Sequence, residues 1–206
     1  MSPLVTALIY FGSFLVIGLI AIETIRDAEA SLGVSIGLVI IGYKIRDAGI
    51  AVAGIVQHNQ FIRDRAKCDM EVEELASGTV LQLSEDRGKE ARGCRLDRAA
   101  LSEAAALLSA SLENGPELVI VNKFGKIEAE GRGLRDTLAD AVQLGVPIVI
   151  GVPYRNIEQW RAFTEGLAEE CSIGSSRLHD WLLQQGFNVN QELGGIPTTE
   201  NIASID

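Results

Sequence analysis

Residues 118–152 read LVIVNKFGKIEAEGRGLRDTLADAVQLGVPIVIGV, and this stretch decides the fold class. Its two apolar runs, Leu118–Val121 and Val146–Val152, are typical of strands that are covered on both faces. Between them, Leu134–Leu144 carries apolar residues at the spacing of one helix face. A strand, a helix and a second strand in this order predict a parallel sheet covered by helices.

The same alternation continues on both sides of this stretch. Upstream, Val34–Tyr43 predicts a helix packed on a core, Ile50–Val56 a buried strand, and Gln57–Lys67 a polar loop. Asp97 is a suitable cap for a helix that ends at Asn114-Gly115. Further helices are predicted over 157–167 and 177–185.

A small hairpin interrupts the alternation. Cys68–Leu75 and Val80–Ser84 flank a turn that contains Gly78. We therefore predict a three-layer α/β domain with a mostly parallel sheet and a β-hairpin insertion. The predicted boundaries are an apolar lead-in at 1–13, one domain at 14–185 with the hairpin at about 67–84 of the sequence, and a loosely attached tail at 186–206.

The apolar N-terminal run Leu4–Ile22 has two interpretations. It is long enough for a membrane span, but glycines and β-branched residues within it favour a buried strand, expected within Phe14–Glu23. No basic flank follows, so we expect no membrane attachment without excluding it. The first charged residue is Glu23, so the positive region of a secretory signal is missing and the cytoplasm is the expected location.

Charge and cysteine content exclude several functions. Lys and Arg number 18 against 28 Asp and Glu, a formal net charge of −10, which argues against nucleic-acid binding. Three cysteines without a CxxC motif do not predict a zinc site or a disulfide framework. Cys94 has arginine neighbours that would favour a thiolate, and Cys68 is a candidate partner. For each cysteine taken singly, a small core residue is the favoured interpretation.

Two loops, Asp86–Arg95 and Asn122–Arg135, carry residues suited to binding an anion. In open α/β sheets the ligand lies beyond the carboxyl ends of the strands, where the loop Asn122–Arg135 follows a predicted strand. Guanidinium and ammonium groups near glycines suit an oxyanion, and Glu128 and Glu130 are candidate acid/base groups. A solvated rim is the competing interpretation. The candidate anion- or nucleotide-binding residues are Arg92, Arg95, Asn122, Lys123, Lys126, Arg132 and Arg135.

The sequence resembles the DUF2478 family. The similarity covers about residues 30–185 and includes GIAVAGIVQ at 49–57, CDM at 68–70, DRGKEARGCRLD at 86–97 and NKFGKIEAEGRG at 122–133. Proteins of this family are labelled nucleoside triphosphatases or molybdenum-transport-associated proteins. The resemblance implies a P-loop-NTPase-like fold, with Thr24–Ala30 in the place of the phosphate loop.

Departures from the nucleotide-hydrolase pattern are as informative as the match. The chain has no G-x-x-x-x-G-K-[ST] motif, so the phosphate-binding lysine and the magnesium-binding hydroxyl are missing. A more distant likeness aligns 122–128 with the D-E-I-G-x-M-E motif of a nucleoside-triphosphatase family. There Asn122 and Lys123 replace the magnesium-binding and catalytic carboxylates, which argues against efficient hydrolysis.

Three functions remain open on these residues. The leading one is a protein that binds a small anion or a nucleotide, with degenerate NTPase motifs and a link to molybdate; nucleotide with magnesium, or molybdate, would be the bound species. The second is a nucleoside triphosphatase or phosphotransferase that uses Glu128 or Glu130. The third is a non-catalytic scaffold that binds a protein partner or a second copy of itself.

Overall fold

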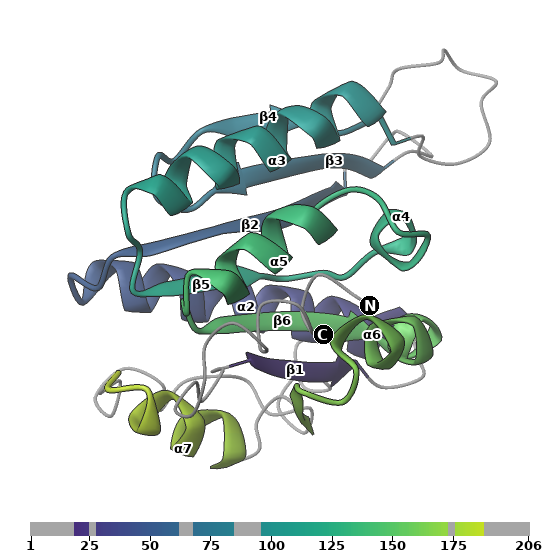
Figure 1. Cartoon of the computed structure of the whole chain (residues 1–206). Coiled ribbons are helices and arrows are strands. Elements are labelled where there is room, and N and C mark those ends of the chain that lie inside the picture. Colours follow the sequence, from purple (N-terminus) through teal and green to yellow (C-terminus); the bar gives the residue numbers. More distant parts are fainter. Residues whose placement is uncertain (1–18, 25–27, 62–67, 85–95, 173–175, 188–206) are drawn as a thin grey trace, which may run out of the picture.

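The computed structural model describes residues 19–24, 28–61, 68–84, 96–172 and 176–187 of the 206-residue chain. In this part of the chain, seven strands form one sheet in the order β4-β3-β2-β5-β6-β1-β7 (Figure 1). The pairs β2–β5, β5–β6, β6–β1 and β1–β7 are parallel, while β3 and β4 add an antiparallel extension at one side. The sheet is therefore mixed, with a parallel centre.

The bounds of the elements follow chain order. The strands are β1 Leu19–Thr24, β2 Val52–Phe61, β3 Cys68–Glu74, β4 Val80–Gln82, β5 Leu118–Val121, β6 Ile148–Pro153 and β7 Glu169–Ser172. The helices are α2 Ala28–Asp47, α3 Arg98–Glu113, α4 Lys126–Ala129, α5 Arg135–Gln143, the 3₁₀ turn η1 Tyr154–Asn156, α6 Ile157–Thr164 and α7 Ser176–Gln184.

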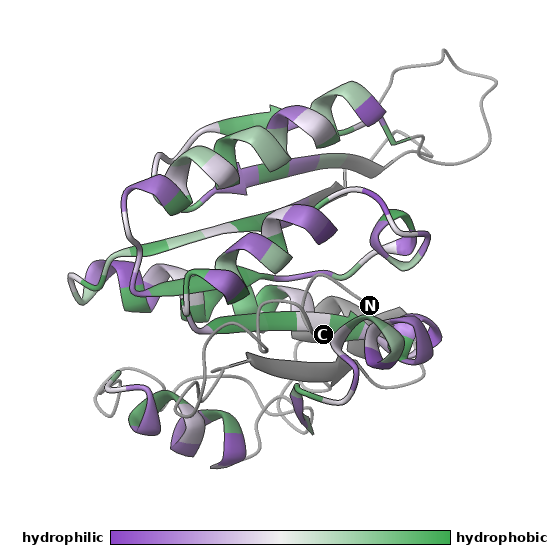
Figure 2. Cartoon of the chain, in the orientation of Figure 1, coloured by the Kyte–Doolittle hydropathy of each residue, from purple (hydrophilic) through white to green (hydrophobic). Residues whose placement is uncertain are grey.

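Two hydrophobic cores lie on opposite faces of the sheet. Helices α3, α5 and α6 bury Leu108, Leu138 and Trp160 in one core, and α2 and α7 bury Ile41 and Trp181 in the other. Strands β5 and β6 supply residues to both cores because successive strand residues point to opposite faces. Figure 2 shows these two central strands as apolar between their helix layers. The three-layer α/β arrangement predicted from the sequence is confirmed.

Most of the predicted elements are present. β5 has the predicted bounds, and the Asp97 side chain caps α3 by accepting hydrogen bonds from the backbone N–H groups of Ala99 and Ala100. The hairpin of β3 and β4 turns at Gly78, whose φ of +68° suits glycine. Of the apolar N-terminal run, Leu19–Thr24 forms β1, close to the predicted strand; residues 1–18 lie outside the described part.

One prediction of secondary structure was wrong, and two elements were missed. The segment Gln57–Lys67 was expected to be a loop, but β2 continues to Phe61 and pairs with β3. Its polar side chains are compatible with a strand because an antiparallel extension can face water on one side. Strand β7 and the four-residue helix α4 were not predicted at all.

No helix within the described residues is long and apolar enough to cross a membrane. The longest helix of this part, α2, has polar and charged residues in its last turn.

Candidate functional site

The predicted loop Asn122–Arg135 lies at the carboxyl edge of the parallel strands. It leaves β5, forms α4, and enters α5 at the right-hand end of the sheet in Figure 1. The start of α6, which follows β6, lies at the same end. The topology therefore places this loop where ligands bind in open α/β sheets.

Asn122 is a buried amide that joins three elements. Its Oδ1 accepts a hydrogen bond from the backbone N–H of Gln57 at 2.8 Å, and its Nδ2 donates to the carbonyl of the same residue at 2.9 Å. Nδ2 also lies 3.5 Å from the carbonyl oxygen of Ser35 on α2. The side chain thus extends the β2–β5 pairing and contacts α2. Its polar atoms are directed to the backbone.

Glu128 organises the loop from within. Its side chain is 5% exposed, and its carboxylate accepts hydrogen bonds from the backbone N–H groups of Gly125 at 2.9 Å and Leu134 at 3.3 Å. Burial raises the pKa of this carboxyl, while the backbone hydrogen bonds and the charge of Lys123 act in the opposite direction. Both oxygens are directed into the loop.

This arrangement requires glycine at position 133. Its φ is +66°, and a Cβ at this position would lie 2.1 Å from Oε1 of Glu128. Gly131 also has a positive φ, +89°. The sequence E-A-E-G-R-G therefore encodes a loop that closes around a buried carboxylate. Sequence reasoning assigned these glycines to anion binding or to a turn, and the geometry supports the turn.

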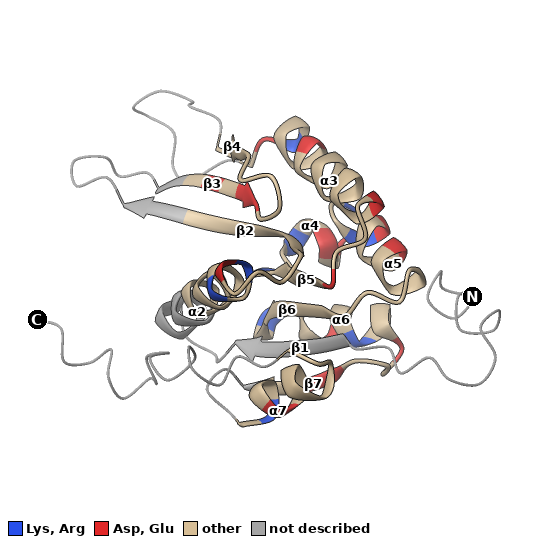
Figure 3. Ribbon diagram, turned by 90° about the vertical axis from the view of Figure 1, so that its left-hand side faces the viewer, with Lys and Arg blue, Asp and Glu red and all other residues tan. Residues whose placement is uncertain are grey.

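The rim of the loop carries an exposed ion-pair network. Glu130 accepts a 2.6 Å hydrogen bond from Nη2 of Arg132 and lies 3.6 Å from Nζ of Lys126. The Arg132 partner lowers the pKa of Glu130. Figure 3 shows positive and negative residues together on α4. The structure therefore brings Lys126, Glu130 and Arg132 together, with the carboxylate between the two cations.

Arg135 has a different environment, an aromatic cluster. Its guanidinium lies 4.2 Å from the ring centroid of Phe163, a cation–π contact. Phe163 packs against Phe124 and Trp160, with centroids 6.2 Å and 6.0 Å away. Trp160 Nε1 is buried and has no hydrogen-bond partner in the described structure.

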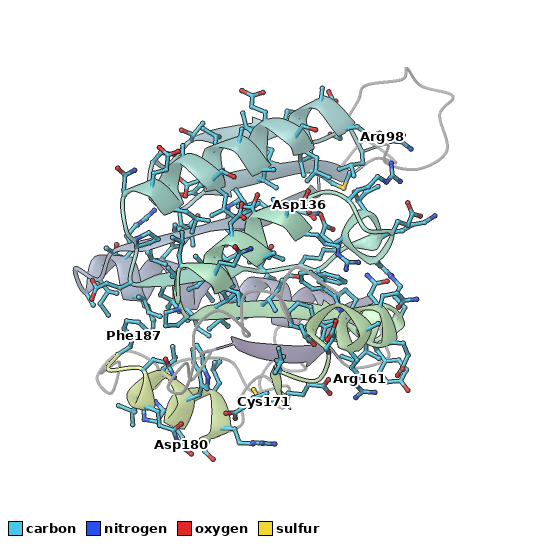
Figure 4. The ribbon with its side chains drawn as sticks, in the orientation of Figure 1. Arg98, Asp136, Arg161, Cys171, Asp180 and Phe187 are labelled. Atoms are coloured by element: carbon cyan, nitrogen blue, oxygen red, sulfur yellow. The ribbon has the colours of Figure 1, made fainter. Side chains whose placement is uncertain are left out.

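Two polar residues at the end of β6 were missed by sequence reasoning. Tyr154 and Arg155 follow the strand directly and are exposed. The signal was available, because a tyrosine and an arginine directly after a buried apolar strand occupy the ligand edge of an open sheet. Figure 4 shows Arg98 at the start of α3 and Arg161 on α6 at this same end of the molecule.

Three predicted site residues lie outside the described residues: Arg92, Cys94 and Arg95. The backbone of Cys68 begins β3 opposite Phe61, but its side chain is also outside the described part, so the proposed thiol pair with Cys94 stays a prediction. Cys171 is a buried free thiol. Within the described residues no group of three or more potential ligands could hold a metal ion.

A second polar cluster joins α2 to β2 and β3. The Tyr43 hydroxyl donates to Oε2 of Glu73, and His58 Nε2 lies 3.3 Å from both of these oxygens. Arg46 Nη1 donates to Oε1 of Glu73 at 3.3 Å. Burial and the hydrogen bond to Glu73 raise the pKa of Tyr43 to about 12. No part of this cluster was predicted from the sequence, because its members are distant along the chain.

These observations define an α/β protein with a mixed sheet and a cation-bearing loop at the carboxyl edge of its parallel strands. The chain belongs to the family described as "Protein of unknown function (DUF2478)", whose sequence profile matches residues 37–181. The resemblance stated from the sequence motifs is thereby confirmed.

One curated relative is similar over much of the family region. It is the molybdenum import ATP-binding protein ModC 2 of Bradyrhizobium diazoefficiens, 38% identical over 136 residues, which are 65% of this chain. The chain spans about 15% of the length of that relative. No solved structure matches the chain.

Proposed function

We propose that this chain binds an oxyanion, either molybdate or the phosphate groups of a nucleotide, at the carboxyl edge of its sheet, and that it acts in molybdenum handling. The observation that carries the proposal is the loop Asn122–Arg135, which holds four cationic and two acidic residues in a protein of net charge −10. Such a local excess of positive charge attracts anions against the overall charge.

The curated relative supports a role in molybdenum handling. A protein named for molybdenum import and ATP binding shares 38% identity with this chain over the matched region. The match covers only 15% of that protein, so the shared region accounts for a minor part of it. We infer an accessory role beside a transport ATPase, in which this chain binds the transported anion or senses the nucleotide.

A P-loop-like fold without the usual phosphate-binding motif fits this role. In our proposal, helix α2 follows β1 where a phosphate loop would lie, and Asn122 follows β5 where a magnesium-binding carboxylate would lie. The Asn122 amide is bonded to the backbone of Gln57, and the Glu128 carboxylate to that of Gly125 and Leu134. These contacts favour binding over hydrolysis, in which Glu128 or Glu130 would have to act as a base.

Thermal unfolding with added ligands tests the proposal. The purified protein is heated with molybdate, tungstate, sulfate, phosphate, ATP or GTP, with and without Mg²⁺. A ligand at about a hundred times its Kd stabilises the fold by roughly 2.7 kcal/mol, which raises Tm by several degrees. A rise with molybdate and tungstate, but not with sulfate, supports molybdenum handling; a rise with nucleotides alone supports the nucleotide arm.

Matched variants locate the binding. Arg132→Ala and Lys123→Ala should reduce the rise in Tm, whereas Lys44→Ala removes a cation from the last turn of α2 and should leave it unchanged. Unchanged curves with all six ligands would contradict the proposal and favour the scaffold function. Mg²⁺-dependent release of phosphate that is lost in Glu130→Gln would favour the hydrolase instead.

A further inference from the structure

The sheet has a point at which the covering helices change faces. Helix α2, which follows β1, packs on one face, whereas α6, which follows β6, packs on the other. β1 and β6 are parallel neighbours, and their pairing ends at Thr24 opposite Pro153. In open α/β sheets, a change of this kind opens a crevice beyond the carboxyl ends of the two strands, and ligands bind there.

Arg155 lies at the carboxyl end of β6, at this edge of the sheet. It lies two residues after the end of β6 and is exposed. Within the described part of the chain, its guanidinium has no hydrogen bond and no ion pair. It therefore differs from Arg132 and Arg161, whose guanidinium groups are bonded to carboxylates.

Two hydrogen bonds hold Arg155 beside the end of β5. The buried side chain of Asn156 donates to the carbonyl oxygen of Phe124 at 2.8 Å, and the N–H of Phe124 donates to the carbonyl oxygen of Gly151 at 2.6 Å. Each residue of the Asn156–Phe124 hydrogen bond has a cation directly before it in the chain, Arg155 and Lys123. The two cations are thus positioned at the carboxyl ends of neighbouring strands.

The described carboxylate closest in sequence to Arg155 is already engaged. Glu158 pairs with Arg161 at 3.0 Å. The positive charge of Arg155 is therefore available to a ligand. A guanidinium presents parallel N–H donors to two oxygens of one group, which suits a tetrahedral oxyanion or a terminal phosphate.

We propose that Arg155 is an oxyanion-binding residue that acts with Lys123, and that the ligand lies beyond the ends of β5 and β6, facing β1. This inference rests on the proposed function and deepens it, since it assigns the ligand to one part of the edge. The ligand class is a dianionic tetrahedral oxyanion, either free molybdate or the phosphate group of a nucleotide.

The test measures the affinity of variants of the full chain by calorimetric titration with molybdate and, separately, with ATP. Removing a charge-assisted hydrogen bond from a ligand weakens binding by about tenfold to a hundredfold, and this is the loss expected for Arg155→Ala. Arg155→Lys keeps the charge and should retain most of the affinity. Lys44→Ala, on α2, should bind like the wild type. Loss of molybdate affinity identifies a free oxyanion as the ligand, and loss of ATP affinity alone identifies a phosphate group.

The outcomes separate this inference from the function on which it rests. If Arg155→Ala and Arg155→Gln bind as the wild type does while Arg132→Ala does not, the ligand lies on the α4 loop, and the inference is overturned with the proposed function intact. If the wild type binds neither ligand, both fail. Because Arg155 is exposed, unfolding midpoints equal to that of the wild type should show that each variant is folded.

Discussion

At the level of single residues, Glu128 is the residue of the predicted site whose burial affects the pH dependence of stability. It is a carboxylate enclosed by its own loop, and burial is the main influence on its pKa. Where the folded state holds a proton that the unfolded chain has released, stability falls as pH rises. Because the pKa of Glu128 is raised, its ionisation destabilises the fold. This loss of stability develops as the pH rises from the ordinary carboxyl pKa to the raised pKa.

We expect Glu128→Gln to change the pH dependence of stability. The free energy of unfolding of the variant, relative to the wild type, should rise as pH increases from about 4 to neutral, because glutamine does not ionise; each unit by which the pKa is raised contributes about 1.4 kcal/mol. Urea unfolding across this range measures the difference. The control is Glu103→Gln, which replaces an exposed carboxylate on α3. Parallel pH profiles for wild type and Glu128→Gln would show that the carboxyl is not perturbed.

At the level of elements, helix α2 is attached to the sheet at two polar contacts. Ser35 is near the Asn122 amide, and Tyr43 with Arg46 reaches Glu73 on β3. α2 also packs on the sheet through apolar residues such as Leu38 and Ile45. The polar contacts fix which way α2 lies over the sheet, because apolar packing alone is not directional.

Tyr43→Phe should weaken this attachment. The variant removes one donor to a carboxylate, so we expect a loss of about 1–2 kcal/mol in the free energy of unfolding at neutral pH. The pKa of Tyr43 is raised to about 12 from an ordinary 10, so the wild type should lose stability as pH rises above 10 and through 12, and the variant should lose less. Urea unfolding and an absorbance titration of the phenols measure both effects. An equal loss of stability above pH 10 in the wild type and in Tyr43→Phe would contradict the prediction.

Sequence patterns could predict the elements whose signal is local. β5 and α3 were predicted correctly because the spacing of their apolar residues and the Asp97 cap can be read from residues close together in the sequence. Of the β7 side chains that the structure describes, Cys171 alone is in the core, and α4 is four residues long, so neither element shows a period. The polar second half of β2 forms a strand because β3 pairs with it, which is tertiary information.

The candidate site also has features that could be predicted from the sequence and features that could not. Its place at the carboxyl edge was predicted, because the loop directly follows a strand of the predicted parallel sheet. The hydrogen bonds between the Asn122 amide and Gln57 could not be predicted, because they depend on where the backbone of β2 lies. The inward orientation of Glu128 could not be predicted either, because it depends on how its own loop closes. The cluster around Glu73 unites residues from three elements and leaves no pattern in the sequence.

At the level of the whole molecule, one sheet separates two cores, and the chain has two tryptophans, one in each. Trp160 lies on α6 and Trp181 on α7. Since β5 and β6 contribute residues to both cores, loss of either helix layer exposes one face of strands whose opposite face forms part of the other core. The two cores are therefore expected to unfold together, as small single domains usually do.

Single-tryptophan variants test this coupling across the sheet. With Trp160→Phe and Trp181→Phe as separate backgrounds, the two fluorescence transitions in urea should have the same midpoint. Leu108 of α3 lies in the same core as Trp160. Leu108→Ala should lower the free energy of unfolding by about 2–5 kcal/mol and shift both transitions equally, although Trp181 lies on the opposite face of the sheet. Ile41→Ala, on α2, is the reciprocal variant and should do the same. A shift confined to the tryptophan of the mutated face would show that the two helix layers unfold independently, and the sheet would then not be one cooperative unit.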